Sequence, residues 1–151
     1  MDAIDKKILM LLQQDAKQNT KLIALQIGLT VSPTFERIKK LEEQKYIKGY
    51  VAVLDGKKID KSILVYCQIS LEKHSIKTIA NFKKEIAKIP DIMSCHHMSG
   101  NYDFLLKVAV NDMNAYQTFV IEKLSVIEGI SNVQSSFVIE EVSNESKYNI
   151  E

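Results

Sequence analysis

The sequence predicts an α+β protein in two parts, an N-terminal winged helix-turn-helix over residues 1–61 and a C-terminal ferredoxin-like βαββαβ domain over residues 62–151. Apolar residues fall at helical spacing up to about residue 44, and strand-like runs rich in Val, Ile and Tyr then alternate with helical stretches. The polar, turn-prone segment 55–61 separates the two patterns and is expected to be the linker.

Composition fits a folded protein of 151 residues, with 46% hydrophobic and 26% charged positions, five Gly and two Pro. The apolar runs are far shorter than a membrane-spanning helix, and the acidic start differs from a secretory signal. Cys67 and Cys95 lie alone in apolar stretches, which suits a reducing compartment. We therefore expect a cytoplasmic protein without a membrane partner.

Three short helices are expected in the N-terminal part. Asp2 can cap the first helix, and Asn19 or Thr20 can cap the second, which ends at Gly28. After a very short turn, Thr30 can cap a third helix. Two helices joined by a tight, glycine-containing turn are typical of a helix-turn-helix. A following strand-like run, 47–54, would make the unit winged.

The third helix has a polar, mostly basic outer face, while Thr34 and Ile38 share its apolar side. Short polar side chains near the start of such a helix can read base edges, and cations behind them can hold phosphates. The alternative is an ordinary solvated face, which the pattern alone makes about equally plausible. The candidate DNA-binding residues are Ser32, Pro33, Thr34, Glu36, Arg37, Lys39 and Lys40.

The runs 28–42 and 46–50, with the opening Asp2-x-x-Asp5-x-x-Ile8-Leu9, resemble the helix-turn-helix of the Lrp/AsnC (feast/famine) transcriptional regulators. The resemblance covers essentially the whole chain. Two positions depart from the family pattern. Lys45 stands where the family usually has Gly, which implies a positive φ, and Glu36 stands where a basic residue is frequent.

The C-terminal part is expected to contain four strands and two helices. The strands are expected at 63–71, 92–98, 104–110 and 133–142, and the helices at 75–88 and 111–127. This order predicts a sheet in strand order 4-1-3-2 with both helices on one face. The other face would remain open and largely apolar, which favours a homodimer with sheets packed face to face. The resemblance implies the same dimer and further assembly to tetramers or octamers.

The loop between the second and third strands looks like the family's Gly-x-Tyr-Asp turn, which in relatives lines a cleft between dimers that binds a small effector, typically an amino acid. Asp103 could accept from the ligand's ammonium, and N–H groups near Gly100 could approach its carboxylate. The alternative, a structural hairpin turn in which Asp103 binds loop amides, is somewhat favoured by the residues alone. The candidate effector-binding residues are Ser99, Gly100, Asn101, Tyr102, Asp103, Gln134, Ser135 and Ser136.

Other chemistries find little support. Cys95 and His97 share one strand face without a third ligand, so no metal site is expected. The predicted strand order separates Cys67 from Cys95 by a whole strand, which is too far for a disulfide. We find no nucleophile triad, phosphate loop or dinucleotide fingerprint, and therefore expect no catalytic residue and no cofactor.

The expected function is sequence-specific transcriptional regulation, with double-stranded DNA and a small amino-acid effector as partners. The charge distribution agrees weakly, with +4 over residues 1–61 and −3 over residues 62–151. One alternative is an amino-acid sensor or adaptor that does not bind DNA. A second is a small ferredoxin-like enzyme, because fold does not fix function.

Overall fold

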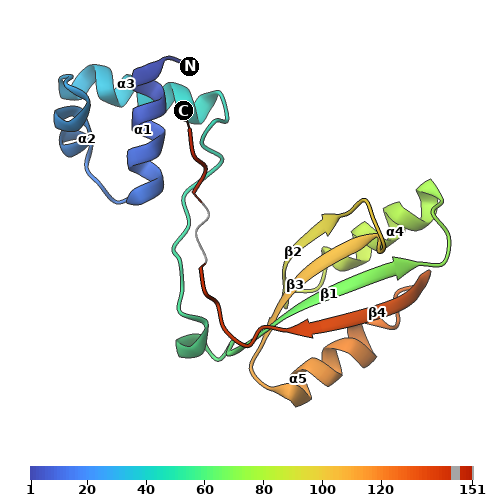
Figure 1. The fold of residues 1–151 in the computed structure, drawn as a ribbon. Helices are drawn as coiled ribbons and strands as arrows, with labels where there is room; N and C mark the ends of the chain where they lie inside the picture. Colours follow the sequence, from blue (N-terminus) through green and yellow to red (C-terminus); the bar gives the residue numbers. More distant parts are fainter. Residues whose placement is uncertain (144–146, 151) are drawn as a thin grey trace. The chain divides into compact units, whose positions relative to one another are not determined.

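The computed structural model describes residues 1–143 and 147–150, which form two compact units (Figure 1). The head comprises residues 1–53 with 143 and 147–150, and the body comprises residues 54–142. The two compact units divide at 53/54, and the expected domain boundary at 61/62 stays a prediction. The end of the chain groups with the head because the Gln13 side chain accepts from the Tyr148 backbone N–H at 2.7 Å and donates to its carbonyl at 3.1 Å.

The head contains the three expected helices, α1 (Ala3–Gln14), α2 (Thr20–Ile27) and α3 (Val31–Glu43). Asp2 and Asp5 form a reciprocal capping box at α1, Asn19 caps α2 through its side chain, and Gly28 ends α2 in the left-handed region at φ 74°. Apolar side chains from all three helices form a small core, made of Ile8, Leu11, Ile23 and Leu41. Across the described chain, no helix has the length and apolar character needed to cross a membrane.

The segment after α3 differs from the expectation. Lys45 adopts the implied positive φ, at 62°. However, no strand forms over 47–54, and the side chains of Val51 and Val53 are both 89% exposed. A strand needs a neighbouring strand for its backbone hydrogen bonds, and within the described residues none pairs with this segment.

The body forms the expected four-stranded antiparallel sheet in the order β2-β3-β1-β4. The strands are β1 (Ile63–Leu71), β2 (Ile92–His97), β3 (Phe104–Val110) and β4 (Ile130–Phe137). The helical segments are the 3₁₀ turn η1 (Gly56–Ile59), α4 (Ile76–Ile86), α5 (Met113–Thr118) and the π-helical η2 (Phe119–Leu124). The fold class predicted from the sequence is therefore confirmed.

Several boundaries differ from the prediction, and β4, for example, begins at Ile130 instead of residue 133. The last helix is interrupted where the backbone changes to π-helical bonding, with Ser125 N–H donating to Val120 O at 2.9 Å. β4 ends at Phe137, opposite Val65, instead of at Val142, and one further bond, from Val138 N–H to Leu64 O at 2.9 Å, continues the pairing with β1.

One face of the sheet packs against the helices and carries the core. Alternate residues of β1 and β3 are buried there, and Phe104 contacts Phe82 of α4 with ring centroids 4.4 Å apart. The open face carries both apolar and polar side chains, whereas we expected a largely apolar surface. By register, its apolar residues are Leu64, Tyr66, Leu105 and Ala109, and its polar residues include Gln68, Ser70, His96, Lys107, Gln134 and Ser136.

Candidate functional site

The outer face of α3 presents five of its seven predicted DNA-binding residues to solvent. These are Ser32, Pro33, Glu36, Lys39 and Lys40. The first two lie in the first turn, where short side chains can approach base edges, and Lys39 and Lys40 lie two turns further on. Lys39 also lies 3.9 Å from Glu43, in an exposed pair that water screens strongly.

Thr34 does not belong to this exposed set, although the sequence suggested that it lies close to bases. Its side chain is fully buried, and its hydroxyl donates to Thr30 O at 2.9 Å. Thr34 therefore packs in the head and leaves no group for a base edge. The sequence contained the signal, because Thr34 is four and seven residues before Ile38 and Leu41 on the apolar side of the helix.

Arg37 is held by α1 instead of extending freely into solvent. Its Nη1 lies 2.7 Å from Asp2 Oδ2 and 2.7 Å from Asp5 Oδ1, and its side chain is only 32% exposed. Hydrogen bonds from the Asp5 backbone and from Arg37 lower the pKa of Asp2, and the two carboxylates raise the pKa of Arg37. The predicted phosphate contact thus faces strong competition from within the head.

A tyrosine that sequence reasoning did not select fixes the segment after α3. Tyr50 donates its hydroxyl to Glu42 Oε1 at 2.8 Å. Burial, followed by this bond to the carboxylate, raises the pKa of Tyr50 to about 12. Phe35 is more than half exposed on α3, and it adds an apolar group beside the polar face.

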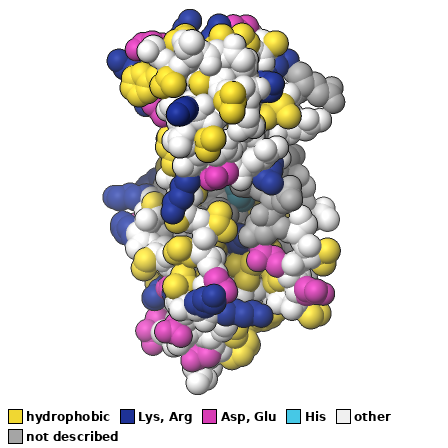
Figure 2. Space-filling view, turned by 90° about the vertical axis from the view of Figure 1, so that its left-hand side faces the viewer, with side chains coloured by type: hydrophobic (Ala, Val, Ile, Leu, Met, Phe, Trp, Pro, Cys, Tyr) yellow, Lys and Arg dark blue, Asp and Glu magenta, His cyan; other side chains and the backbone are white. Residues whose placement is uncertain are grey.

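Charges of both signs alternate on the surface. On the face drawn in Figure 2, Lys and Arg side chains are interspersed with Asp and Glu side chains and with hydrophobic ones. On α3 itself, the exposed Lys39 and Lys40 are accompanied by the exposed Glu36 and Glu43, so the helix contributes its basic side chains singly. Two copies of the helix would double their number on a duplex.

The loop after β2 is organised around Asp103. Asp103 Oδ2 accepts from Leu71 N–H at 2.7 Å, and Oδ1 lies 2.7 Å from His74 Nε2. The Asp103 backbone N–H donates to Ile69 O at 2.8 Å, and its carbonyl accepts from Met98 N–H at 2.8 Å. These contacts give Asp103 structural partners outside its own loop, namely Leu71 at the end of β1 and His74, and its role toward a ligand stays a prediction. Sequence reasoning did not select His74.

The other loop residues surround this turn. Ser99, Gly100 and Asn101 are exposed, Tyr102 is partly buried, and Gly100 has a φ of 148°, which favours glycine. The loop can therefore offer polar groups to a ligand while Asp103 holds its shape.

The three candidates on β4 point in different directions. Gln134 and Ser136 pair with Gln68 and Tyr66 and share the open face of the sheet. Ser135 faces the helices instead, where its hydroxyl bonds to the Tyr116 hydroxyl. Because neighbouring strand residues alternate, Ser135 cannot join the other two.

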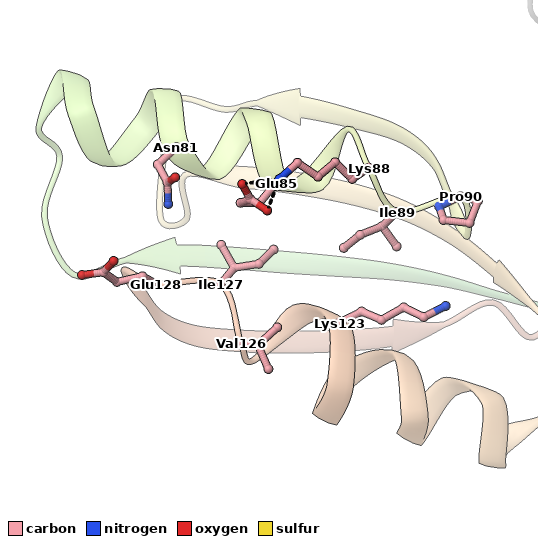
Figure 3. Close-up of a pocket in the computed structure, with 9 residues that line it drawn as sticks. All are labelled: Asn81, Glu85, Lys88, Ile89, Pro90, Lys123, Val126, Ile127 and Glu128. Atoms are coloured by element: carbon pink, nitrogen blue, oxygen red, sulfur yellow. Dashed lines mark hydrogen bonds and ion pairs between the residues drawn. The ribbon is translucent and has the colours of Figure 1, made fainter.

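A hollow of about 450 Å³ lies on the helix side of the body, between α4 and residues 123–128 (Figure 3). Three of the charged side chains that line it are paired, which leaves Glu128 at its edge. Lys88 lies 2.6 Å from Glu85, and the ammonium of Lys123 extends away to Asp91, also at 2.6 Å. None of the sequence-predicted effector residues lines this hollow.

The two cysteines are free, with Cys67 buried and Cys95 exposed. His97 stacks on Phe104 with ring centroids 4.6 Å apart. Among the residues that the structure describes, no three His, Cys, Asp or Glu side chains gather as candidate metal ligands.

The sequence matches two protein families in succession. Residues 1–48 match a winged helix-turn-helix DNA-binding domain, and residues 64–148 match the Lrp/AsnC ligand binding domain. The Bkd operon transcriptional regulator of Pseudomonas aeruginosa is 37% identical over 142 residues, which cover 94% of this chain and 93% of that protein. The leucine-responsive regulatory protein of Escherichia coli is 34% identical over 147 residues, or 97% and 90% of the two chains.

Solved structures agree over nearly the full length. An AsnC family transcriptional regulator from Agrobacterium tumefaciens superposes with a TM-score of 0.92 and 34% identity, covering 99% of this chain and 97% of that one. A transcriptional regulator from Neisseria meningitidis, solved as an L-Met complex, superposes with a TM-score of 0.94 and 28% identity, covering 99% and 96%. The chain therefore belongs to the Lrp/AsnC family of DNA-binding transcriptional regulators, which joins its helix-turn-helix head to its ligand-binding body.

Proposed function

We propose that this regulator acts as a cytoplasmic homodimer whose two α3 helices enter successive major grooves, and that an amino acid modulates its DNA binding. The observation that carries the proposal is the match of the body to a ligand binding domain, together with the likeness to a regulator solved with L-Met. No feature of the chain favours the sensor without DNA binding.

For DNA, the proposed interface keeps the exposed residues of α3. Ser32 and Pro33 approach base edges from the first turn, and Lys39 and Lys40 approach phosphates. Glu36 is exposed on the same face, where a carboxylate repels phosphate but can accept from a cytosine amine. Thr34 is left out because it is buried.

For assembly, two features of the single chain support pairing with a second copy. The open face of the sheet places Leu64, Tyr66 and Leu105 at its centre, partly exposed. Val51 and Val53 leave large apolar side chains in water. A two-fold dimer covers such surfaces and supplies the spacing of two recognition helices, and dimers can assemble further into tetramers or octamers.

For the effector, the proposed site combines the loop 99–103 with Gln134 and Ser136. The carboxylate of Asp103 has spare lone pairs beyond its two present bonds, so a ligand ammonium either shares it or displaces His74. Backbone N–H groups near Gly100 suit the ligand carboxylate. Ser135 is excluded because it faces the helices.

Sedimentation velocity and duplex-binding titrations, each with and without the twenty amino acids, test the proposal. We expect a dimer or a multiple of it, and a change in assembly size or DNA affinity with at least one amino acid. Gln134→Ala should weaken that response, whereas Asn132→Ala, a neighbouring exposed position on the same strand face, should not. A monomer would exclude the dimer, and an unchanged assembly and affinity with every amino acid would exclude the effector.

A further inference from the structure

At the start of α1, the carboxylates of Asp2 and Asp5 each accept a backbone hydrogen bond and also bind Arg37. Asp2 Oδ1 accepts from Asp5 N–H at 2.8 Å, and Asp5 Oδ2 accepts from Asp2 N–H at 3.1 Å, which closes the capping box. The remaining oxygens, Asp2 Oδ2 and Asp5 Oδ1, each lie 2.7 Å from Arg37 Nη1. The capping box therefore forms a two-oxygen receptor for a single guanidinium nitrogen of α3.

The charges of this cluster do not favour a phosphate. Two carboxylates and one guanidinium sum to −1 at neutral pH, and Glu36 and Lys40, which line the same surface hollow, offset one another. The lowered pKa of Asp2 and the raised pKa of Arg37 both favour the charged forms of this ion pair. If Arg37 turned to a phosphate, it would leave two neighbouring carboxylates without their shared counter-charge.

The ion pairs also give α3 a directional contact with α1. The other contacts between the two helices come from apolar side chains such as Ile8, Leu11 and Leu41, and apolar packing is non-directional. Charge-assisted hydrogen bonds depend on geometry, so these two fix the start of α1 against the middle of α3.

We propose that Arg37 is a positioning residue of the DNA-binding head, which holds α3 at the angle that presents Ser32 and Pro33 to base edges, and that it makes no phosphate contact. The proposal rests on the proposed function, since it assumes that α3 is the helix that enters the groove.

Salt titrations of duplex binding by the full chain separate positioning from phosphate contact. A phosphate contact contributes about 0.9 to the slope of log affinity against log salt. We expect Lys40→Met to reduce that slope by about this amount. Arg37→Met, which keeps an apolar side chain, should leave the slope unchanged and lower affinity roughly two- to fivefold at every salt concentration. A folded fraction that is constant over the salt range lowers the affinity without changing the slope, and circular dichroism at each salt concentration checks that it is constant.

A mutant cycle gives an independent readout. Asp2→Asn with Asp5→Asn removes two negative charges, and asparagine still caps a helix. If Arg37 positions α3, this charge removal raises DNA affinity more in the Arg37→Met background than in the wild type, where it also breaks the ion pairs. If Arg37 contacts phosphate, the charge removal instead raises DNA affinity more in the wild type than in the Arg37→Met background. The reason is that the guanidinium, once freed from the carboxylates, binds DNA.

Each outcome has a distinct meaning. A reduced slope for Arg37→Met, or the reversed order in the cycle, would overturn the positioning role while leaving the α3 interface intact. An unchanged slope for Lys40→Met, or a flat salt dependence of the wild type, would instead overturn the proposed interface and the inference with it.

Discussion

The head and the body are held together in different ways. The body buries side chains from β1, β3 and the helical segments α4, α5 and η2 in one continuous core that includes Phe82, Phe104 and Phe119. The head has only four residues in its core cluster, and it adds polar contacts at its edges. These are the Arg37 ion pairs, the Tyr50 bond to Glu42, and the Gln13 contacts with Tyr148.

The difference follows from size. A unit of about 60 residues buries a smaller share of its surface than a larger one, so directional polar contacts have more influence on its geometry. The comparison teaches that stability is concentrated in the body, whereas the geometry of DNA recognition depends on a few contacts in the head. Four predictions test this contrast.

The largest effect is expected from Phe104→Ala in the body. The ring is fully buried and contacts both Phe82 and His97. Its loss should lower the free energy of unfolding of the body by about 3–5 kcal/mol, measured by chemical denaturation. Ile121→Ala, at a side chain that is more than half exposed, is the control and should cost little. An equal loss of unfolding free energy in the two variants would contradict a core that lies on the helix-covered face of the sheet.

A smaller effect is expected where the chain enters the sheet from the linker. Asp91 lies 2.6 Å from Lys123 Nζ and 3.2 Å from Lys61 Nζ, and these bonds, Lys123 first, lower its pKa. A lowered folded-state pKa stabilises the protein above the unfolded value and loses that effect as the pH falls through the folded value. Asp91→Asn should therefore cost about 1 kcal/mol at pH 7, because both lysines are partly exposed.

The pH dependence provides the check. The difference between Asp91→Asn and the wild type should shrink as the pH falls below 3.8, the ordinary Asp value. Asp112→Asn, where asparagine can keep the helix cap, serves as the control. A difference that stays constant from neutral to acid pH would show that the carboxylate charge is unimportant.

In the head, Thr34→Val tests burial against DNA contact. Valine keeps the shape of the side chain and removes only the bond to Thr30 O, so stability should fall by about 1 kcal/mol. The sequence preference selected from random duplexes should stay the same. Ser32→Ala should give the converse result, with stability nearly unchanged and the preference altered. A changed DNA sequence preference in Thr34→Val would show that Thr34 contacts bases.

The smallest effect is expected from Gln13→Ala, which removes both bonds to the Tyr148 backbone. Because these bonds are exposed, the head should lose about 0.5 kcal/mol, while proteolysis near the C-terminus should become faster. Gln14→Ala, at the adjacent helical position, is the matched control. Equal cleavage rates in the two variants would show that the Gln13 contacts with Tyr148 do not support the head.

Local residue chemistry determined much of this protein. The spacing of Ile4, Ile8 and Leu11, the caps at Asp2 and Asn19, and the left-handed Gly28 specify the head helices from contacts a few residues apart. Alternation along residues 63–71 and 104–110 likewise specifies β1 and β3 and, through the order of elements, the sheet topology. Even the positive φ of Lys45 followed from a single departure from the family pattern.

Only the tertiary structure decided which polar side chains are available for function. Arg37 was predicted to contact phosphate, but its guanidinium forms ion pairs with the carboxylates of Asp2 and Asp5 at the start of α1. Asp103, the proposed acceptor for a ligand ammonium, already binds Leu71 N–H and His74, two partners that the sequence did not reveal. Sequence patterns assign residues to faces because helical and strand periodicities are local. They do not identify the partner of a polar group, because that partner is brought close only when distant segments pack together.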